Sequence, residues 1–80
     1  MKKTITKEIA PRITVDPAVK SGRPVIKGTR VPVELVIGKL AGGMTVDEVM
    51  REYDVAKKDV LAALDYAAKL VGDEEVRVVN

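Results

Sequence analysis

The spacing of the apolar residues along the chain changes near Pro32. Before this proline, β-branched residues occur in short runs that predict extended pieces over residues 4–9, 12–15, 25–26 and 29–31. Each piece is too short to form a stable sheet by itself, so we expect the pieces to pair with one another or with a second chain. After Pro32 the apolar residues recur at helical spacing, which predicts a helical remainder.

Two helices are predicted between Pro32 and Tyr53. The first begins at Pro32 and ends at Gly42-Gly43, with one apolar face formed by Val33, Val36, Ile37, Leu40 and Ala41. The second begins with the capping-box pattern of Thr45 and Glu48, in which each side chain accepts a hydrogen bond from the other residue's backbone N–H. Its apolar face comprises Val46, Val49, Met50 and Tyr53.

The third helix is the longest and begins near Lys57. Gly72 is expected in the left-handed conformation that ends many helices. The expected buried stripe comprises Val60, Leu61, Leu64, Ala67, Ala68 and Val71, and the expected solvent-facing stripe comprises Lys58, Ala62, Asp65 and Lys69. A short helix, a four-residue turn and a long helix match a helix-turn-helix. The predicted fold class is mainly α, a three-helix bundle preceded by short β-strands, and residues 76–79 fit either a further strand or a disordered end.

Composition limits both the core and the chemistry. Eighty residues form one small domain with an aliphatic core, because the chain has two tyrosines and neither phenylalanine nor tryptophan. Such a core supplies roughly 3–5 kcal/mol, which favours a homodimer as a source of further buried surface. Cysteine and histidine are absent, so we expect no disulfide, metal site, cofactor or enzymatic activity. No apolar run approaches the roughly 18 residues of a membrane span, and we expect a cytoplasmic protein.

Charge is distributed unevenly along the chain. Residues 1–32 carry eight Lys and Arg against two acids, whereas residues 33–80 carry six against ten. A basic N-terminal third suggests contact with nucleic acid or with an acidic partner, and a solvated basic tail is the simpler alternative. The candidate DNA-binding residues in this third are Arg12, Lys20, Arg23, Lys27 and Arg30.

Lys57 and Lys58 are the other candidate DNA contacts, because the recognition helix of a helix-turn-helix enters the major groove through its N-terminal residues. The simpler alternative is that both lysines are solvated. Residues 45–71 carry four cations against six acids, so this unit would bind DNA weakly by itself. We therefore expect the basic N-terminal segment to make much of any DNA contact.

The segment from Ser21 to Val33 is the most unusual stretch. It does not match a phosphate-binding loop, because Lys27 precedes Gly28 and Pro32 intervenes before the helix. A structural role is favoured, and Gly28 is expected to allow a turn at positive φ. The residues of this structural motif are Gly22, Pro24, Gly28, Thr29 and Pro32. Arg30 then fits a salt bridge to Asp16 or Glu34 as well as it fits a phosphate contact.

Proline, glycine, threonine and arginine recur at fixed offsets in a set of runs: Ile13-Thr-Val-Asp-Pro17, Gly22-Arg-Pro-Val-Ile-Lys-Gly-Thr-Arg-Val-Pro-Val33, Ala41-Gly-Gly-Met-Thr45 and Asp59-Val-Leu-Ala-Ala-Leu-Asp-Tyr-Ala67. Over residues 12–71 these runs resemble a family of small prokaryotic domains of unknown function with the signature G-K/R-P-V-I-x-G-T-R-I/V-P-V. The resemblance implies a homeodomain-like helix-turn-helix. It also implies a type II antitoxin that binds a PIN-like ribonuclease toxin and its own operator DNA. Ala56 stands where the family often has Ser or Thr, so Asp54 or Asp59 must cap the third helix.

The resemblance divides the chain into an N-terminal arm (1–11), an antitoxin-like domain (12–72) and a C-terminal tail (73–80). The tail joins acidic to aliphatic residues, and a flexible acidic segment could mimic RNA on the ribonuclease. Its candidate partner-binding residues are Asp73, Glu74, Glu75, Val76 and Val78. The simpler alternative for the tail is a frayed helix end. For the whole chain, the alternative is an oligomerisation or protein-interaction module that binds no DNA.

Overall fold

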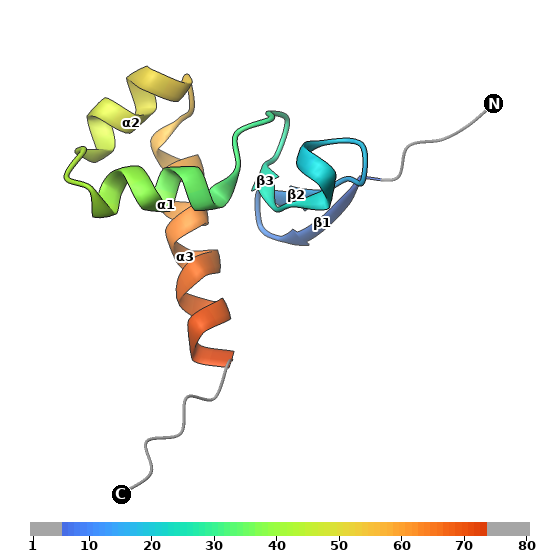
Figure 1. The fold of residues 1–80 in the computed structure, drawn as a ribbon. Coiled ribbons are helices and arrows are strands. Elements are labelled where there is room, and N and C mark those ends of the chain that lie inside the picture. The colour runs from blue at the N-terminus through green and yellow to red at the C-terminus, as the bar shows by residue number, and fades with distance from the viewer. Residues whose placement is uncertain (1–5, 74–80) are drawn as a thin grey trace, which may run out of the picture.

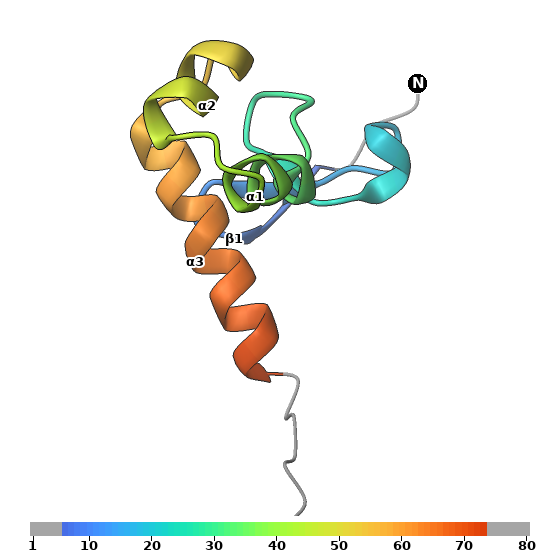
Figure 2. The same cartoon turned by 60° about the vertical axis from the view of Figure 1, so that its left-hand side comes forward.

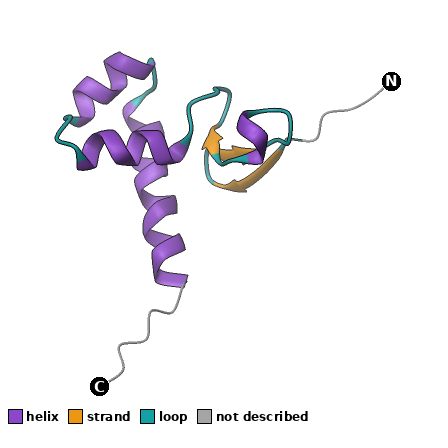
Figure 3. Cartoon of the chain, viewed as in Figure 1, coloured by secondary structure: helices purple, strands orange, loops and turns teal. Residues whose placement is uncertain are grey.

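The computed structural model describes residues 6–73 as a small sheet followed by helices (Figures 1 and 3). In chain order the elements are β1 (Lys7–Ala10), β2 (Ile13–Val15), a 3₁₀ turn (Lys20–Gly22), β3 (Val25–Ile26), α1 (Val33–Ala41), α2 (Val46–Tyr53) and α3 (Lys57–Asp73). The fold is therefore mixed and helix-rich, because the strands form a true sheet in front of the predicted helices.

The strands form one antiparallel sheet in the order β1-β2-β3. Lys7 pairs with Val15, and Ile13 pairs with Ile26, so the predicted extended pieces do pair with one another. The predicted extended piece over residues 29–31 is not a strand, since these residues form a loop that returns to β3. The first predicted strand begins at Lys7, and residues 4 and 5 lie outside the described part of the chain.

Helices α1 and α2 follow their predicted boundaries closely. Pro32 immediately precedes α1, and Gly42 follows its last residue, although Ala41 is exposed rather than buried. The predicted capping box of α2 is present. The Thr45 Oγ1 accepts from the Glu48 N–H at 3.1 Å, and the Glu48 Oε1 accepts from the Thr45 N–H at 2.9 Å.

Helix α3 is rotated relative to the prediction. Val60 and Ala63 are fully buried, whereas Leu61, Leu64 and Val71 of the predicted buried stripe are exposed. Ala68 is also exposed, and Ala62 is partly buried instead of facing solvent. The cause is that apolar residues occur on several faces of this helix, so its period alone does not single out one of them. Gly72 is likewise not a left-handed cap, because α3 continues to Asp73.

One core joins the sheet to all three helices. Its fully buried side chains come from β2, β3, α1, α2 and α3 in turn: Ile13, Ile26, Val36, Val49 and Val60. The sheet is thus part of the folded body, and α3 extends past α1 and α2 at its C-terminal end (Figure 2). Residues 68–72 of this extension are all exposed.

Candidate functional site

The family-like segment after Gly22 folds into a closed loop around Ile26. The Ile26 N–H donates to the Val31 carbonyl at 3.0 Å, and its own carbonyl accepts from both the backbone N–H (3.0 Å) and the hydroxyl (2.7 Å) of Thr29. The Thr29 hydroxyl in turn accepts from the Val31 N–H at 3.0 Å. Gly28 has the expected positive φ, at 79°. These bonds give the loop one defined shape and direct the chain into α1.

Both ends of this loop are held by neighbouring prolines. The Pro24 carbonyl accepts from the Val33 N–H at 3.0 Å, and Pro32 forms an isolated bridge with Val25. The Pro32 carbonyl also accepts from the Leu35 and Val36 N–H groups in the first turn of α1. Gly22, at the far end of the motif, has a φ of 81° directly after the 3₁₀ turn. Each of the motif residues therefore has a backbone role in this structure.

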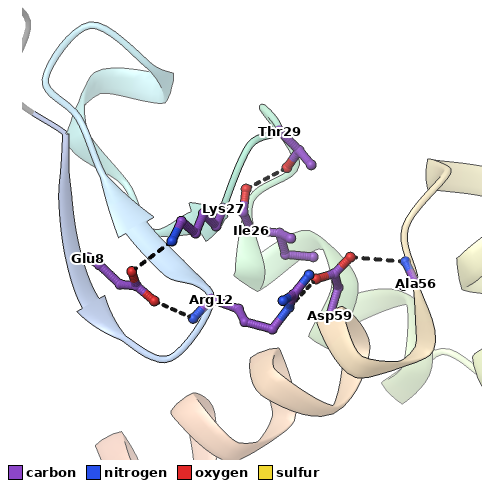
Figure 4. A network of polar contacts seen from close by, with 7 residues as sticks. All are labelled: Glu8, Arg12, Ile26, Lys27, Thr29, Ala56 and Asp59. Atoms are coloured by element: carbon purple, nitrogen blue, oxygen red, sulfur yellow. Dashed lines mark hydrogen bonds and ion pairs between the residues drawn. The ribbon is translucent and has the colours of Figure 1, made fainter.

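Arg12 connects the sheet to the start of α3. Its Nε donates to the Asp59 Oδ1 at 2.6 Å, while the Asp59 Oδ2 accepts from the Ala56 N–H at 3.0 Å (Figure 4). Asp59 thereby provides the cap expected from either Asp54 or Asp59. Burial opposes the charged carboxylate, but the hydrogen bonds from Ala56 and Arg12 outweigh it and hold the pKa of Asp59 below its ordinary value of 3.8.

Glu8 forms a second polar cluster on the sheet. Its carboxylate accepts from the Arg12 backbone N–H at 2.8 Å and from the Lys27 ammonium at 3.1 Å (Figure 4). The hydrogen bond from the Arg12 backbone N–H is the main cause that lowers the pKa of Glu8, and the hydrogen bond from Lys27 is the second. Because Arg12 adopts a φ of 65°, the Glu8 carboxylate helps to hold a turn that an L-residue rarely adopts.

The structure separates the candidate DNA contacts into two groups. Three of them pair with carboxylates of the same chain: Arg12 with Asp59, Lys27 with Glu8, and Arg23 with Glu34 at 2.6 Å. The other four are exposed and form no ion pair within residues 6–73: Lys20, Arg30, Lys57 and Lys58. The alternative partners suggested for Arg30 are engaged elsewhere, since Asp16 accepts from Thr6 and Ala18.

Two apolar surfaces run along α3. The first, here called the open stripe, comprises Leu61, Leu64, Ala68 and Val71 and is exposed. The second is a groove of about 440 Å³ between α1 and α3. Its walls include Val33 and Ile37 from α1 and Tyr66 and Leu70 from α3, with Arg23 and Glu34 among the remaining lining residues. Sequence reasoning missed the open stripe because it assigned those residues to the core.

The candidate partner-binding tail lies almost entirely beyond the described chain. Asp73 is the last residue of α3, and Glu74, Glu75, Val76 and Val78 fall outside the described residues. Within residues 6–73, no group of three His, Cys, Asp or Glu side chains could hold a metal ion. None of the helices in this part of the chain is long and apolar enough to cross a membrane.

This chain is similar to a known protein family and to a solved structure. No curated protein matches the chain. The crystal structure of Rv2018 from Mycobacterium tuberculosis is similar, with a TM-score of 0.61 and 35% sequence identity over 65% of this chain. The match spans only 24% of that longer protein. Residues 13–67 match a family described as protein of unknown function (DUF433), and this match covers the sheet-to-helix loop and most of the bundle. The chain therefore belongs to the DUF433 family.

Proposed function

We propose that this chain is a type II antitoxin that neutralises a PIN-like ribonuclease and binds operator DNA to regulate its own transcription. The observation that carries the proposal is the junction of α2 and α3. Residues 54–56 join the two helices, and Asp54 adopts a left-handed φ of 55°. This connection suits a homeodomain-like helix-turn-helix, in which α3 would be the recognition helix.

The charge around the start of α3 also supports DNA binding. Lys57 and Lys58 are exposed in its first turn, and the neighbouring acid Asp59 is neutralised by Arg12. Arg12 lies outside the acidic stretch 45–71, so the ion pair removes one of the six negative charges that oppose DNA binding in that stretch. Lys20 and Arg30 supply further cations without an ion pair in the described chain.

Replacing both lysines, as Lys57→Ala with Lys58→Ala, is expected to weaken binding to the DNA upstream of the coding sequence. For each phosphate that the variant no longer binds, the slope of log affinity against log salt should become less steep by about 1. Gel shifts at several salt concentrations measure both effects. Lys39→Ala, on the exposed side of α1, is the control and should bind like wild type. If wild type causes no retardation even at low salt, the DNA half of the proposal is rejected.

The ribonuclease half rests on the family resemblance and on the acidic, aliphatic sequence that follows α3. Acidic side chains can occupy a site that normally binds polyanionic RNA, and a short segment can become ordered on its partner. The groove between α1 and α3 offers apolar surface for the same contact, and Leu70, three residues before the helix ends, is one of its lining residues.

Deleting residues 74–80 is expected to abolish protection against a PIN-like ribonuclease encoded beside the chain. Growth after co-expression and RNA cleavage by the purified pair measure the effect. Glu74→Gln with Glu75→Gln separates charge from length and should weaken protection partially, whereas deletion of residues 1–5 is the control. Full protection by the truncated chain would reject a role for the tail.

A protein-interaction module without DNA binding is the second candidate, and one observation favours it. Three of the five candidate cations in the N-terminal third are engaged by carboxylates of the same chain. A phosphate group would have to compete with these carboxylates, which reduces the charge available to DNA. The same gel shift discriminates the two candidates, since the module predicts protection against the ribonuclease without any retardation of DNA.

A further inference from the structure

The open stripe of α3 is an apolar surface without a cover in the described part of this chain. Leu61 is 49% exposed, Leu64 38% and Val71 64%, and Ala68 between them is exposed as well. Their spacing of three, four and three residues is the a/d pattern of helices that pack side by side. The stripe lies on the side of α3 away from Ala63, so the groove toward α1 is a separate surface.

The stripe is also symmetric along the helix. Leu61 and Val71 lie equally far from residue 66, and so do Leu64 and Ala68. If a second α3 runs antiparallel with position 66 as the centre, Leu61 faces Val71 of the other copy and Leu64 faces its Ala68. Each layer then combines a larger with a smaller side chain, which lets two helices approach closely and fill the space between them. A parallel pair would instead place Leu64 against Leu64 and Ala68 against Ala68.

Charge favours the same orientation. Lys57 and Lys58 occupy the first turn of α3, where cations oppose the helix dipole. A parallel copy would bring the basic starts of both helices together, whereas an antiparallel copy places them at opposite ends of the pair.

We propose that a second copy of this chain covers the open stripe, and that the two α3 helices pair antiparallel about a two-fold axis at the level of residue 66. Two-fold dimers are self-complementary, which is the property this stripe shows. The sequence suggested that the extended pieces could pair with a second chain. In the structure they pair with one another, so the open stripe replaces them as the expected dimer surface. The inference goes beyond the proposed function, because pairing needs neither DNA nor ribonuclease. Since Lys57 lies at the end of the stripe, pairing and DNA contact would compete for it.

Sedimentation equilibrium of the full chain without DNA tests the pairing. Wild type should form a species of twice 8.7 kDa. Leu64→Glu should raise the dissociation constant by at least roughly 100-fold, because a dimer would bury unpaired carboxylates. Leu70→Glu is the matched control on the groove side of the same helix and should remain dimeric. Circular dichroism checks that both variants fold, as expected for residues already exposed in one copy.

Cross-linking tests the orientation, and the absence of natural cysteine makes it unambiguous. A mixture of Leu61→Cys and Val71→Cys chains should form mixed disulfides faster than either variant forms disulfides alone. A monomeric wild type at high concentration, a Leu64→Glu variant that stays dimeric, or cross-links only between identical positions would each overturn the proposal. A dimer retained by Leu64→Glu together with lost ribonuclease protection would assign the stripe to the ribonuclease instead.

Discussion

Replacing Asp59 with alanine is expected to lower the free energy of unfolding by about 2–3 kcal/mol, the sum of a lost helix cap and a lost charge-assisted hydrogen bond. Asp59 is 7% exposed and accepts hydrogen bonds from two elements, the Arg12 side chain and the Ala56 backbone. Its removal therefore weakens the start of α3 and its attachment to the sheet at once. The Arg12 side chain remains 40% exposed and can turn toward solvent, which keeps the loss below that of a fully buried pair.

The stability difference between wild type and Asp59→Ala should also depend on pH. The pKa of Asp59 is lowered in the folded protein, so its contribution is complete above the unfolded value near 3.8. The contribution is lost as the pH falls through the depressed folded value. Wild type and Asp59→Ala should therefore converge in stability at acidic pH and differ at neutral pH. Urea unfolding, followed by circular dichroism at a series of pH values, measures this convergence.

Asp65 supplies the control for Asp59. It also lies on α3 and also forms an ion pair, with Lys69 at 3.1 Å, but both side chains are more than half exposed. Asp65→Ala should change stability by no more than about 0.5 kcal/mol. Combining Asp59→Ala with Arg12→Ala completes a double-mutant cycle. Losses that simply add would show that Arg12 and Asp59 do not interact energetically, contrary to the geometry.

Local signals in the sequence were enough to place the helices. The capping box of α2 joins residues three positions apart, and Asp59 caps Ala56 over the same short distance. The positive φ at Gly28 was also predictable, since the residue type itself suggested it. Each of these features depends on neighbours in the chain, and their chemistry can be read from the side chains alone.

Contacts between distant segments could not be read in this way. Arg12 and Asp59 are 47 positions apart, and nothing in the sequence distinguishes Asp59 from the other acids as the partner of Arg12. The rotation of α3 was missed for a related reason. Val60, Leu61, Ala63 and Leu64 are all apolar, and only the docking of α1, α2 and the sheet decides which of them are buried. That docking is a property of the whole fold.

Ion pairs within the chain explain part of the uneven distribution of charge along the sequence. Arg12 and Arg23 of the basic third pair with Asp59 and Glu34 of the acidic remainder. Part of the asymmetry that suggested nucleic acid is thus complementarity between two parts of one fold. The cations left for DNA are those without such partners in the described chain, and they are the ones that a gel shift should examine first.

Replacing Ile26 with alanine is expected to unfold most of the protein. The Ile26 side chain has no exposed surface and packs in the core shared by the sheet and the helices, while its backbone forms the centre of the closed loop. Truncating a buried isoleucine to alanine costs about 2–5 kcal/mol, and a core of this size provides only roughly 3–5 kcal/mol in total.

Ile26→Val should cost about 0.5–1.5 kcal/mol and remain folded. Ile9→Ala, the same change at a residue 40% exposed on β1, should cost about 0.5 kcal/mol or less. Thermal and urea unfolding of the three variants measure this order, and an Ile26→Ala protein as stable as Ile9→Ala would show that the loop does not depend on the core.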